Sequence, residues 1–364
     1  MERTIAVLPG DGIGPEVIAE AVKVLRVIGD RFNCEFRFAE ALVGGAAFER
    51  YGVHFPEETG RICEASEAIL FGAVGGPVSE LHLPKWHKCE ANSILALRKR
   101  FAFAANLRPV RIYRELAAFS PLRQELLEGG VDILFVRELL GDLYFGDKRR
   151  FERDGVRVAS DVAEYTEVQV AQVAHVAFLA AGRRRGKVTS VDKANVLETS
   201  RLWREVVREI AVGYPGVELE EMLVDNCAMQ IIRQPGHFDV ILTSNMFGDI
   251  LSDAGGVIPG SLGMLASASM NEHGFGLFEP PSGSAPDIAG ANVANPIGAI
   301  LSAGMLLRFS LKMEEAAQAI EAAVSAVLAA GGRTKDITLP GEPFVGTKEM
   351  GDLVAGALLI HDNT

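Results

Sequence analysis

Residues 238–253 read FDVILTSNMFGDILSD, and this stretch carries the strongest structural signal in the chain. Its first part, Phe238 to Thr243, is a short apolar run with a β-branched bias, which is typical of a buried strand. From Met246 onward the pattern becomes helical. The stretch therefore predicts a buried strand that passes directly into a helix.

Two aspartates lie on this predicted helix. Asp249 and Asp253 are four residues apart, so they share one helix face with side chains about 5–6 Å from each other. Two like charges at that spacing repel, and no basic residue is nearby in the sequence. A hard divalent ion, Mg²⁺ or Mn²⁺, would satisfy both carboxylates. The alternative is that one aspartate caps the helix while the other is solvated.

Composition excludes several classes of protein. At 364 residues, with 48% hydrophobic and 23% charged residues, the chain is expected to form one large or two medium globular domains. A net charge of -12 argues against nucleic-acid or membrane-surface binding, which both need a positive face. No apolar run is long enough to span a membrane, and the N-terminus shows no signal-peptide pattern. The four cysteines are scattered without metal-site spacing, so we expect a reduced, cytoplasmic protein.

A glycine-rich turn near the N-terminus invites a dinucleotide-binding interpretation. It follows a predicted strand and spans residues 9–16, but Pro15 stands where the GxGxxG fingerprint needs its third glycine. No acidic residue ends a second strand about 20 residues later, as ribose recognition in that fold requires. A Rossmann fold is therefore excluded. A second glycine-rich turn, at residues 72–77, has no fingerprint either and is equally explained as a tight turn.

Three arginines occupy positions suited to carboxylate binding. Arg98 ends an apolar helical run, Arg108 lies in an extended segment before a proline, and Arg137 ends a predicted strand. Guanidinium groups at such ends bind carboxylates with two hydrogen bonds. Each arginine taken alone is better explained as a surface ion pair, because such pairs are common and weak. Tyr144, in the loop that follows Arg137, is either a proton donor or a packed aromatic.

Further polar residues follow at predicted strand ends and in a small-residue loop. Lys193 comes at the end of a strand and is a candidate base, or else it pairs with a carboxylate. Residues 217–226 alternate like a strand and deliver Asp225. In the loop at residues 283–290, small residues let the backbone approach a flat or phosphorylated ligand, and Asp287 could accept from a ribose diol.

Together these motifs resemble the β-decarboxylating hydroxyacid dehydrogenases, the isocitrate/isopropylmalate dehydrogenase family, over nearly the whole chain. The most specific matches, in order, are NLRP (106–109), VREL (136–139), DKAN (192–195), NMFGDILSD (245–253) and GSAPDIAG (283–290). The resemblance implies an α/β fold of two domains with a mixed sheet, which is not a Rossmann fold. It assigns residues 1–103 and 260–364 to the cofactor-side domain and 104–259 to an inserted domain with the dimer interface.

The resemblance also implies a set of site residues. Arg98, Arg108 and Arg137 correspond to a clamp on the substrate carboxylates. Asp225, Asp249 and Asp253 correspond to the ligands of one Mg²⁺ or Mn²⁺ per active site. Lys193 resembles the base and Tyr144 the acid, with Lys193 and Asp225 supplied across the interface of a homodimer. NAD is expected at Gly76, Pro77 and the following segment to Glu90, and at Gly283, Ser284, Ala285, Pro286, Asp287 and Asn295. Asp287 disfavours the 2′-phosphate of NADP.

Substrate choice in this family depends on the helix before Arg98. Ile94 offers branched apolar surface where isocitrate would need a polar group, and burying an isopropyl group there is worth about 1–3 kcal/mol. We therefore expect NAD-dependent oxidation and decarboxylation of 3-isopropylmalate, a step of leucine biosynthesis. Homoisocitrate, D-malate or another 2-alkylmalate is the alternative, because residues 140–142 read LGD where many relatives have TGG. A non-catalytic metal-binding protein is disfavoured by the presence of Tyr144 and Lys193.

Overall fold

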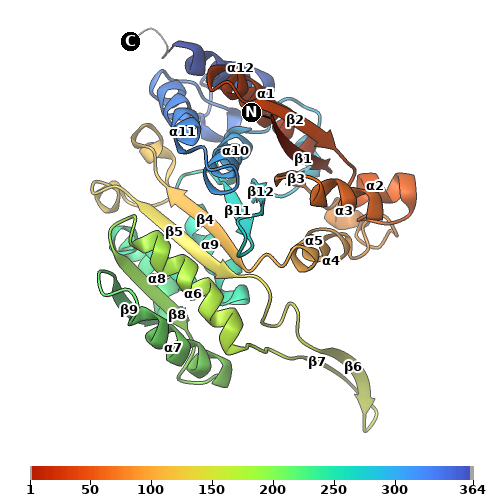
Figure 1. The fold of residues 1–364 in the computed structure, drawn as a ribbon, viewed down its shortest axis with the longest axis vertical. Coiled ribbons are helices and arrows are strands. Elements are labelled where there is room, and N and C mark those ends of the chain that lie inside the picture. Colours follow the sequence, from red (N-terminus) through yellow and green to blue (C-terminus); the bar gives the residue numbers. More distant parts are fainter. Residues whose placement is uncertain (1, 361–364) are drawn as a thin grey trace. The chain divides into compact units, whose positions relative to one another are not determined.

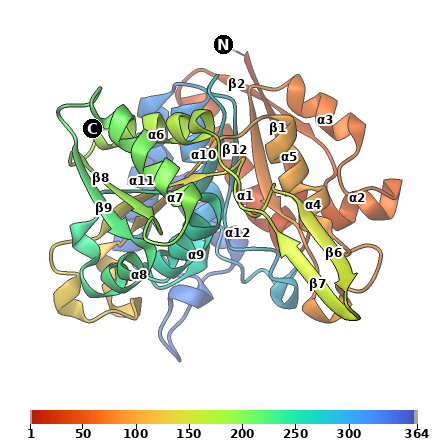
Figure 2. The same cartoon turned by 90° about the horizontal axis from the view of Figure 1, so that it is seen from below.

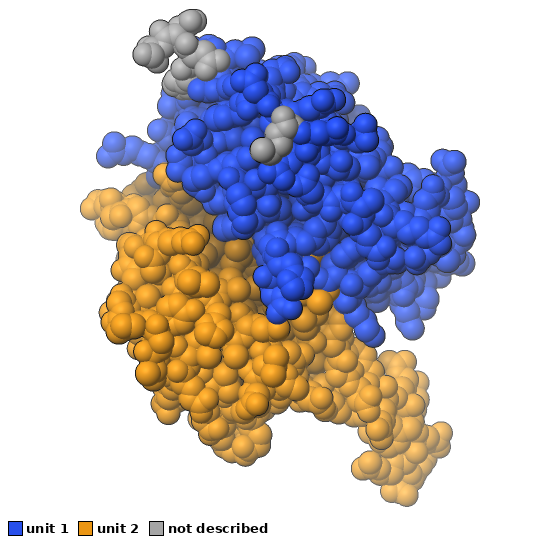
Figure 3. Space-filling view, viewed as in Figure 1, with its two compact units in different colours: residues 1–101, 113–119, 259–364 blue, residues 102–112, 120–258 orange. Residues whose placement is uncertain are grey.

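Residues 2–360 of the protein are described here from a computed structural model (Figure 1). The chain divides into two compact units, coloured separately in Figure 3. Unit 1 comprises residues 1–101, 113–119 and 259–364, and unit 2 comprises residues 102–112 and 120–258. Residues 113–119, which the sequence-based division assigns to the inserted domain, group with unit 1. The division itself stays a prediction.

Unit 1 is built on strands in the order β2-β1-β3-β12-β11. Strand β1 pairs in parallel with β2 and β3, whereas β12 is parallel to β3 and antiparallel to β11. The strands are β1 (Glu2–Gly10), β2 (Glu35–Glu40), β3 (Ala68–Ala73), β11 (Ser267–Met270) and β12 (Gly276–Glu279). Its helices are α1 (Gly14–Arg31), α2 (Gly44–Tyr51), α3 (Glu57–Glu64), α4 (Cys89–Asn92), α5 (Ile94–Arg100), α10 (Ile297–Phe309), α11 (Glu314–Ala329) and α12 (Thr347–Ile360).

The core of unit 1 lies between its strands and helices α1 and α10. Helix α1 starts with Pro15 in its first turn, where a missing backbone N–H costs nothing. It buries Val17, Ala21, Val24 and Ile28, which recur at helical spacing. Helices α11 and α12 pack against α10 and α1. This packing holds the ends of β1 and β3, where both glycine-rich turns begin.

Unit 2 is built on strands in the order β4-β5-β10-β8-β9. Strand β4 is antiparallel to β5, and the remaining neighbours are parallel. The strands are β4 (Ala105–Arg111), β5 (Asp132–Glu138), β8 (Lys187–Asp192), β9 (Glu218–Leu223) and β10 (Val240–Thr243). Its helices are α6 (Glu167–Ala181), α7 (Glu198–Ala211), α8 (Val224–Arg233) and α9 (Asn245–Gly256). Both units thus contain parallel and antiparallel pairs, as the mixed-sheet prediction requires.

Helices cover both faces of the strands of unit 2. Helices α6 and α7 pack together on one face, and α8 and α9 on the other (Figure 2). Helix α6 begins with a capping box in which the Thr166 side chain and Gln169 each bond the other's backbone N–H. Phe135, Phe178 and Trp203 are almost completely buried between these layers. Central strand β10 is fully buried, as its apolar sequence predicted.

The register of the parallel strands explains why the polar motifs converge. Thr243 on β10 pairs with Arg137 on β5 and with Val191 on β8. The carboxyl ends of these three strands therefore lie at one edge, and ligands of α/β proteins bind at such edges. The chain leaves that edge towards Tyr144 after β5, Lys193 after β8 and α9 after β10.

A separate two-stranded hairpin leaves unit 2 between β5 and α6. Its strands β6 (Lys148–Arg153) and β7 (Val156–Asp161) are antiparallel, and most of their side chains are exposed, including Phe151 and Val156. An isolated hairpin of this kind gains little stability by itself.

Within residues 2–360, no helix combines the length and the apolar character needed to cross a membrane.

Candidate active site

Helix α9 begins directly after β10 and lies against Arg137. Gly248 makes this approach possible, because a Cβ at that position would come within 2.3 Å of Thr243 Oγ1 and 2.7 Å of Arg137 Cγ. Real side chains do not pack that closely, so the glycine is required where helix and strand meet. The predicted strand-to-helix transition is confirmed, and it presents Asp249 one turn into the helix.

The two aspartates of α9 face the two arginines of the neighbouring strands. Arg108 Nη1 donates to Asp253 Oδ1 at 2.7 Å, and its Nη2 lies 3.6 Å from Asp249 Oδ1. Arg137 Nη1 also donates to Asp249 Oδ1. The repulsion expected between the aspartates is thus offset by guanidinium groups that are more than 100 residues away in the sequence. One guanidinium reaches both carboxylates, which shows that they point to a common region.

Tyr144 lies in the same cluster. Its hydroxyl donates to Asp249 Oδ2 at 2.6 Å, and the Arg137 guanidinium carbon lies 5.5 Å from the centre of its ring. The structure therefore brings together four of the residues picked out from the sequence: Arg108, Arg137, Tyr144 and Asp249, with Asp253 beside them. A tyrosine hydroxyl held by a carboxylate is oriented for proton transfer, so the packed-aromatic interpretation of Tyr144 is incomplete.

Lys193 and Asp225 form a second pair in unit 2. Lys193 Nζ donates to Asp225 Oδ1 at 2.5 Å, and this hydrogen bond lowers the pKa of the Asp225 carboxyl. The sequence pattern predicted that a strand delivers Asp225, but β9 ends at Leu223 and Asp225 lies in the first turn of α8. That prediction was wrong in detail, because alternation over residues 217–223 does not show where the strand ends. The exposed aspartate benefits from the helix N-terminus.

The structure of one chain does not gather all three expected metal ligands. Among the described residues, no group of three or more His, Cys, Asp or Glu side chains is arranged to hold a metal ion. Asp249 and Asp253 still fit such an ion chemically: they offer carboxylate oxygens one helical turn apart, and Arg108 shows that both reach a shared position. Asp225, 60% exposed, is available to another chain.

Several buried polar residues behind this cluster had no role in the sequence analysis. Asn245 Oδ1 accepts from Arg137 Nε at 3.1 Å and from Nη2 at 2.7 Å. The backbone N–H of Asn245 donates to the hydroxyl of Tyr165, which also hydrogen-bonds to Glu138. The sequence contained one indication that these residues belong to the site: Asn245 and Glu138 lie within the motifs NMFGDILSD and VREL, which also contain Asp249 and Arg137. Polar residues inside a motif are easily assigned to packing.

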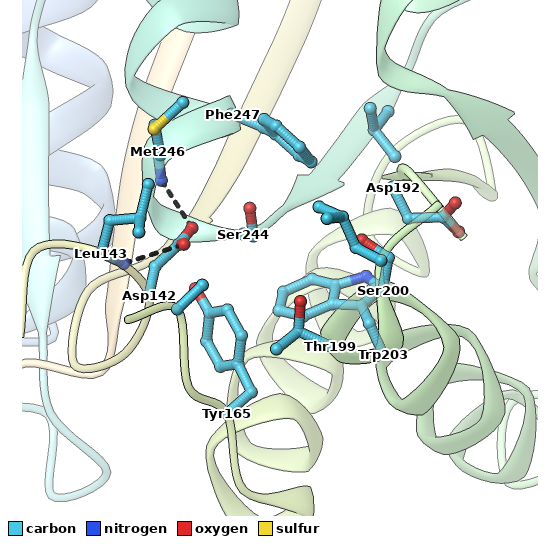
Figure 4. Close-up of a pocket in the computed structure, with 13 residues that line it drawn as sticks. Asp142, Leu143, Tyr165, Asp192, Thr199, Ser200, Trp203, Ser244, Met246 and Phe247 are labelled. Atoms are coloured by element: carbon cyan, nitrogen blue, oxygen red, sulfur yellow. Dashed lines mark hydrogen bonds between the residues drawn. The ribbon is translucent and has the colours of Figure 1, made fainter. Parts of the chain in front are cut away.

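A cavity of about 190 Å³ lies in unit 2 beside these residues. Tyr165, Ser200, Trp203 and Phe247 line it, as Figure 4 shows, and most of its wall is apolar. Asp142, at its edge, accepts hydrogen bonds from the backbone N–H groups of Leu143 and Met246. Leu143 and Asp192, which precede Tyr144 and Lys193 in the sequence, also line the cavity.

In unit 1, Arg98 lies at the end of α5 as the sequence predicted. It is 7% exposed, and its Nη2 lies 3.7 Å from Glu279 Oε1 at the end of β12. Ile94 begins the same short helix and is also buried, at 9% exposed. One helix thus carries the expected cation and the expected apolar contact one turn apart.

The two loops expected to bind NAD are both fixed to the N-terminal turn of unit 1. Buried Asp11 accepts from the backbone N–H of Gly75 at 3.1 Å and from those of Gly45 and Ala46. The N–H of Ile13 donates to the carbonyl of Ser284 at 2.8 Å. Burial raises the pKa of Asp11, while the backbone N–H groups act in the opposite direction. No motif in the sequence pointed to a role for Asp11.

The remaining expected NAD residues differ in their surroundings. Gly76 packs against the indole of Trp86, and Pro77 follows it. Gly283 and Ala285 have φ values of +73° and +36°, and Asp287 and Glu90 are exposed. A Cβ at Gly283 would meet no atom within 4 Å, so the backbone there is open to a flat ligand. Pro286 begins a 3₁₀ turn. Asn295 instead accepts from the N–H of Ile297 and donates to Asp336, which gives it a structural role at the start of α10.

The isocitrate/isopropylmalate dehydrogenase family model matches residues 4–354. The chain belongs to the isocitrate/isopropylmalate dehydrogenase family. This confirms the family predicted from the motifs, and with it the two-domain type of α/β fold with a mixed sheet.

Named members of the family resemble the chain along its whole length. A 3-isopropylmalate dehydrogenase from Carboxydothermus hydrogenoformans is 55% identical, over 98% of this chain and 94% of the relative. One from Clostridium pasteurianum is 51% identical, over 97% and 98%. The crystal structure of an isocitrate dehydrogenase from Methylococcus capsulatus has a TM-score of 0.86 at 33% identity, and the match covers 98% of this chain and 99% of that one.

Proposed function

We propose that the chain catalyses the NAD-dependent oxidative decarboxylation of 3-isopropylmalate to 2-oxoisocaproate and CO₂, in leucine biosynthesis. Relatives named for this activity are 51–55% identical to the chain over almost its full length. The isocitrate dehydrogenase of known structure is more distant, at 33%. The observation in the structure that carries the proposal is the cluster of Arg108, Arg137, Tyr144 and Asp249 at the edge of unit 2.

The arginines supply the charge that an anionic substrate needs. The chain has a net charge of -12, so a dicarboxylate must be bound by local cations against the overall field. Arg108 and Arg137 lie on adjacent strands and converge on Asp249. In the proposal they bind the malate carboxylates together with Arg98, whose position at the end of α5 follows Ile94 by one turn. Ile94 contacts the isopropyl group.

Two side chains move protons in the proposed reaction. Lys193 accepts the proton of the substrate hydroxyl as the hydride leaves the same carbon. Tyr144 gives its hydroxyl proton to the carbon that has lost CO₂. Asp249 orients that hydroxyl through the 2.6 Å hydrogen bond, and well-oriented general acids accelerate reactions by about 10²–10⁴-fold.

A divalent ion and NAD supply the chemistry that these side chains lack. Asp249 and Asp253 of one chain and Asp225 of another would hold Mg²⁺ or Mn²⁺, which polarises the oxygen on the reacting carbon. NAD accepts the hydride and would lie on the segments Gly76–Glu90 and Gly283–Asn295. Asp287 would accept from the ribose diol and exclude a 2′-phosphate.

A homodimer with shared sites completes the proposal. Helices α8 and α9 pack together and expose the large apolar side chains Met229, Ile232 and Ile250, and Val257, directly after α9, is exposed as well. Exposed apolar groups on adjacent helices are typical of an interface. Asp225 lies on α8 and Asp249 on α9, and in the proposal two copies meet on these helices so that Asp225 of one lies beside Asp249 of the other. The cytoplasmic location stays a prediction.

The proposal is tested by following NADH formation at 340 nm with a panel of 2-hydroxy acids. The panel contains 3-isopropylmalate, isocitrate, homoisocitrate, D-malate and other 2-alkylmalates, each with Mn²⁺ and NAD or NADP. We expect kcat/KM to be highest with 3-isopropylmalate and NAD. A higher kcat/KM with another 2-alkylmalate would show that this compound is the preferred substrate of the same oxidative decarboxylation. No turnover with any compound of the panel would refute the proposal.

A further inference from the structure

The loop that carries Tyr144 is tied at its base to a buried carboxylate. Glu138, the last residue of β5, has no exposed surface. One of its oxygens accepts from the N–H of Leu140 at 2.6 Å, and the other accepts from the N–H of Gly141 at 2.9 Å. Buried carboxylates are costly unless donors surround them, so these bonds define how the chain turns out of the strand.

A second buried carboxylate ties the same loop to helix α9. Asp142 is 8% exposed, and its oxygens accept from the N–H of Leu143 at 2.9 Å and from the N–H of Met246 at 3.0 Å (Figure 4). Met246 lies in the first turn of α9, where backbone N–H groups have no partner within the helix. One aspartate thus connects the residue before Tyr144 to the helix that carries Asp249.

The backbone conformation of Asp142 is one that glycine adopts more easily than aspartate. Its φ is +69°, in the left-handed region that favours glycine. Asp and Asn tolerate this region better than other residues, but glycine would adopt it without cost. Asp142 stands where many relatives of the family have glycine, so this chain carries some backbone strain there, and its two hydrogen bonds are what glycine could not provide.

A third connection joins the base of the loop to Arg137. The Tyr165 hydroxyl hydrogen-bonds to Glu138 and accepts from the N–H of Asn245, whose side chain accepts from Arg137 and donates to the carbonyl of Gly141. All of these groups are buried, and satisfied buried networks hold one arrangement. The loop, the arginine and the start of α9 are thereby fixed to one another.

From this geometry we propose that Glu138 and Asp142 are positioning residues for the reaction. They hold Tyr144 within hydrogen-bonding distance of Asp249, and Tyr144 transfers its proton from this position. Neither Glu138 nor Asp142 touches the reacting atoms. The inference rests on the proposed function of Tyr144 as the acid. A displacement of about 1 Å in such a group can cost about 10²-fold in rate, so small shifts of this loop are sufficient to slow turnover.

The ionisation of Glu138 provides a readout that packing alone would not affect. Burial raises its pKa to about 7; the two backbone N–H groups and Tyr165 act against this shift, and nearby Asp142 adds to it. The ionised form accepts both loop N–H groups, whereas the protonated form presents an O–H that competes with them. Loss of the charge is therefore expected to loosen the loop and to appear in the pH profile of kcat.

The test compares Glu138→Gln, Asp142→Gly and Asp142→Asn with a matched control in the full-length enzyme. Gln can accept only one of the two N–H groups, Gly removes the tether but suits φ +69°, and Asn keeps one acceptor. Asp239→Asn is the control: Asp239 is 1% exposed and accepts from Arg184 Nε at 2.8 Å and from Arg185 N at 2.9 Å at the opposite end of β10. For each variant, kcat, KM, the pH profile of kcat and the unfolding temperature are measured.

We expect Glu138→Gln to lower kcat about tenfold or more and Asp142→Gly about threefold or more, with smaller changes in KM, because positioning acts on the transition state. The step near pH 7 should be lost in Glu138→Gln, and Asp142→Asn should fall between wild type and Asp142→Gly. The control should lose unfolding temperature and keep kcat and the pH profile. If the Glu138 and Asp142 variants behave like the control, the proposal is overturned.

Crystal structures of the variants separate this inference from the proposed function. The Tyr144–Asp249 hydrogen bond should be broken or lengthened in Asp142→Gly, which is expected to fold even if Glu138→Gln does not. An unchanged bond would overturn the positioning role regardless of turnover. A wild-type enzyme that is inactive with every 2-hydroxy acid would instead refute the proposed function while leaving this structural comparison decisive.

Discussion

The Tyr144 hydroxyl donates to Asp249 Oδ2 at 2.6 Å, and the other oxygen of that carboxylate accepts from Arg137. Asp249 thus connects the proposed acid to the proposed substrate clamp. A residue shared in this way couples proton transfer to binding, because movement of the carboxylate alters both partners.

Tyr144→Phe should therefore lower kcat by about 10²-fold or more, since it removes the proton donor and leaves the ring in place. Turnover is measured by NADH formation, and stability by thermal unfolding. Tyr214→Phe is the matched control, because the Tyr214 hydroxyl bonds only the exposed His175 Nδ1, at 2.9 Å, among the hydrogen bonds described. Equal kcat values in the two variants would remove Tyr144 from the chemistry.

Chelation of divalent ions with EDTA should abolish turnover, and Mg²⁺ or Mn²⁺ should restore it. Asp253→Asn removes one carboxylate from the proposed ligands, so we expect the Mn²⁺ concentration for half-maximal activity to rise about tenfold or more. Calorimetric titration with Mn²⁺ measures the same change without turnover. The control is Asp352→Asn, because Asp352 is 67% exposed against 66% for Asp253 and pairs with Lys23. Full activity in EDTA would refute the metal site.

Mixing two nearly inactive variants tests whether sites are shared between chains. Tyr144→Phe and Lys193→Ala are each expected to keep about 1% or less of wild-type turnover as homodimers. In a mixed dimer, one site receives Tyr144 from one chain and Lys193 from the other, both intact. Random reassociation should then recover about a quarter of wild-type activity, because half of the dimers carry one good site. No recovery after verified exchange of chains would mean that both residues act within one chain.

Ile94→Ser should raise KM for 3-isopropylmalate by about tenfold, because burying the isopropyl group contributes on the order of 1–3 kcal/mol. The ratio of kcat/KM for isocitrate to that for 3-isopropylmalate should rise correspondingly. Val212→Ser is the control, since Val212 is 82% exposed at the end of α7. An unchanged ratio in Ile94→Ser would show that another residue selects the substrate.

Local patterns in the sequence were sufficient to predict the strand-to-helix transition before Asp249, the extended segment that carries Arg108, and the positions of Arg98 and Arg137 near the ends of a helix and a strand. They could not predict what neutralises Asp249 and Asp253. The sequence shows no basic residue nearby, yet Arg137 and Arg108 are 112 and 145 residues from their aspartate partners. Sheet register brings them together, and register depends on the whole fold. The buried network behind Arg137 was missed for the same reason.

Stability should depend on pH through Glu138. Its folded-state pKa is raised by burial from 4.5 to about 7, so between these values the folded chain keeps a proton that the unfolded chain has released. The free energy of unfolding therefore falls as pH rises through this window, by about 3 kcal/mol in total, and does not fall further above it. Glu138→Gln cannot titrate and lacks this contribution. Urea unfolding at pH 5 and pH 8 should show that the stability of wild type relative to Glu138→Gln is smaller at pH 8, and a difference that does not change with pH would mean that Glu138 is ionised throughout.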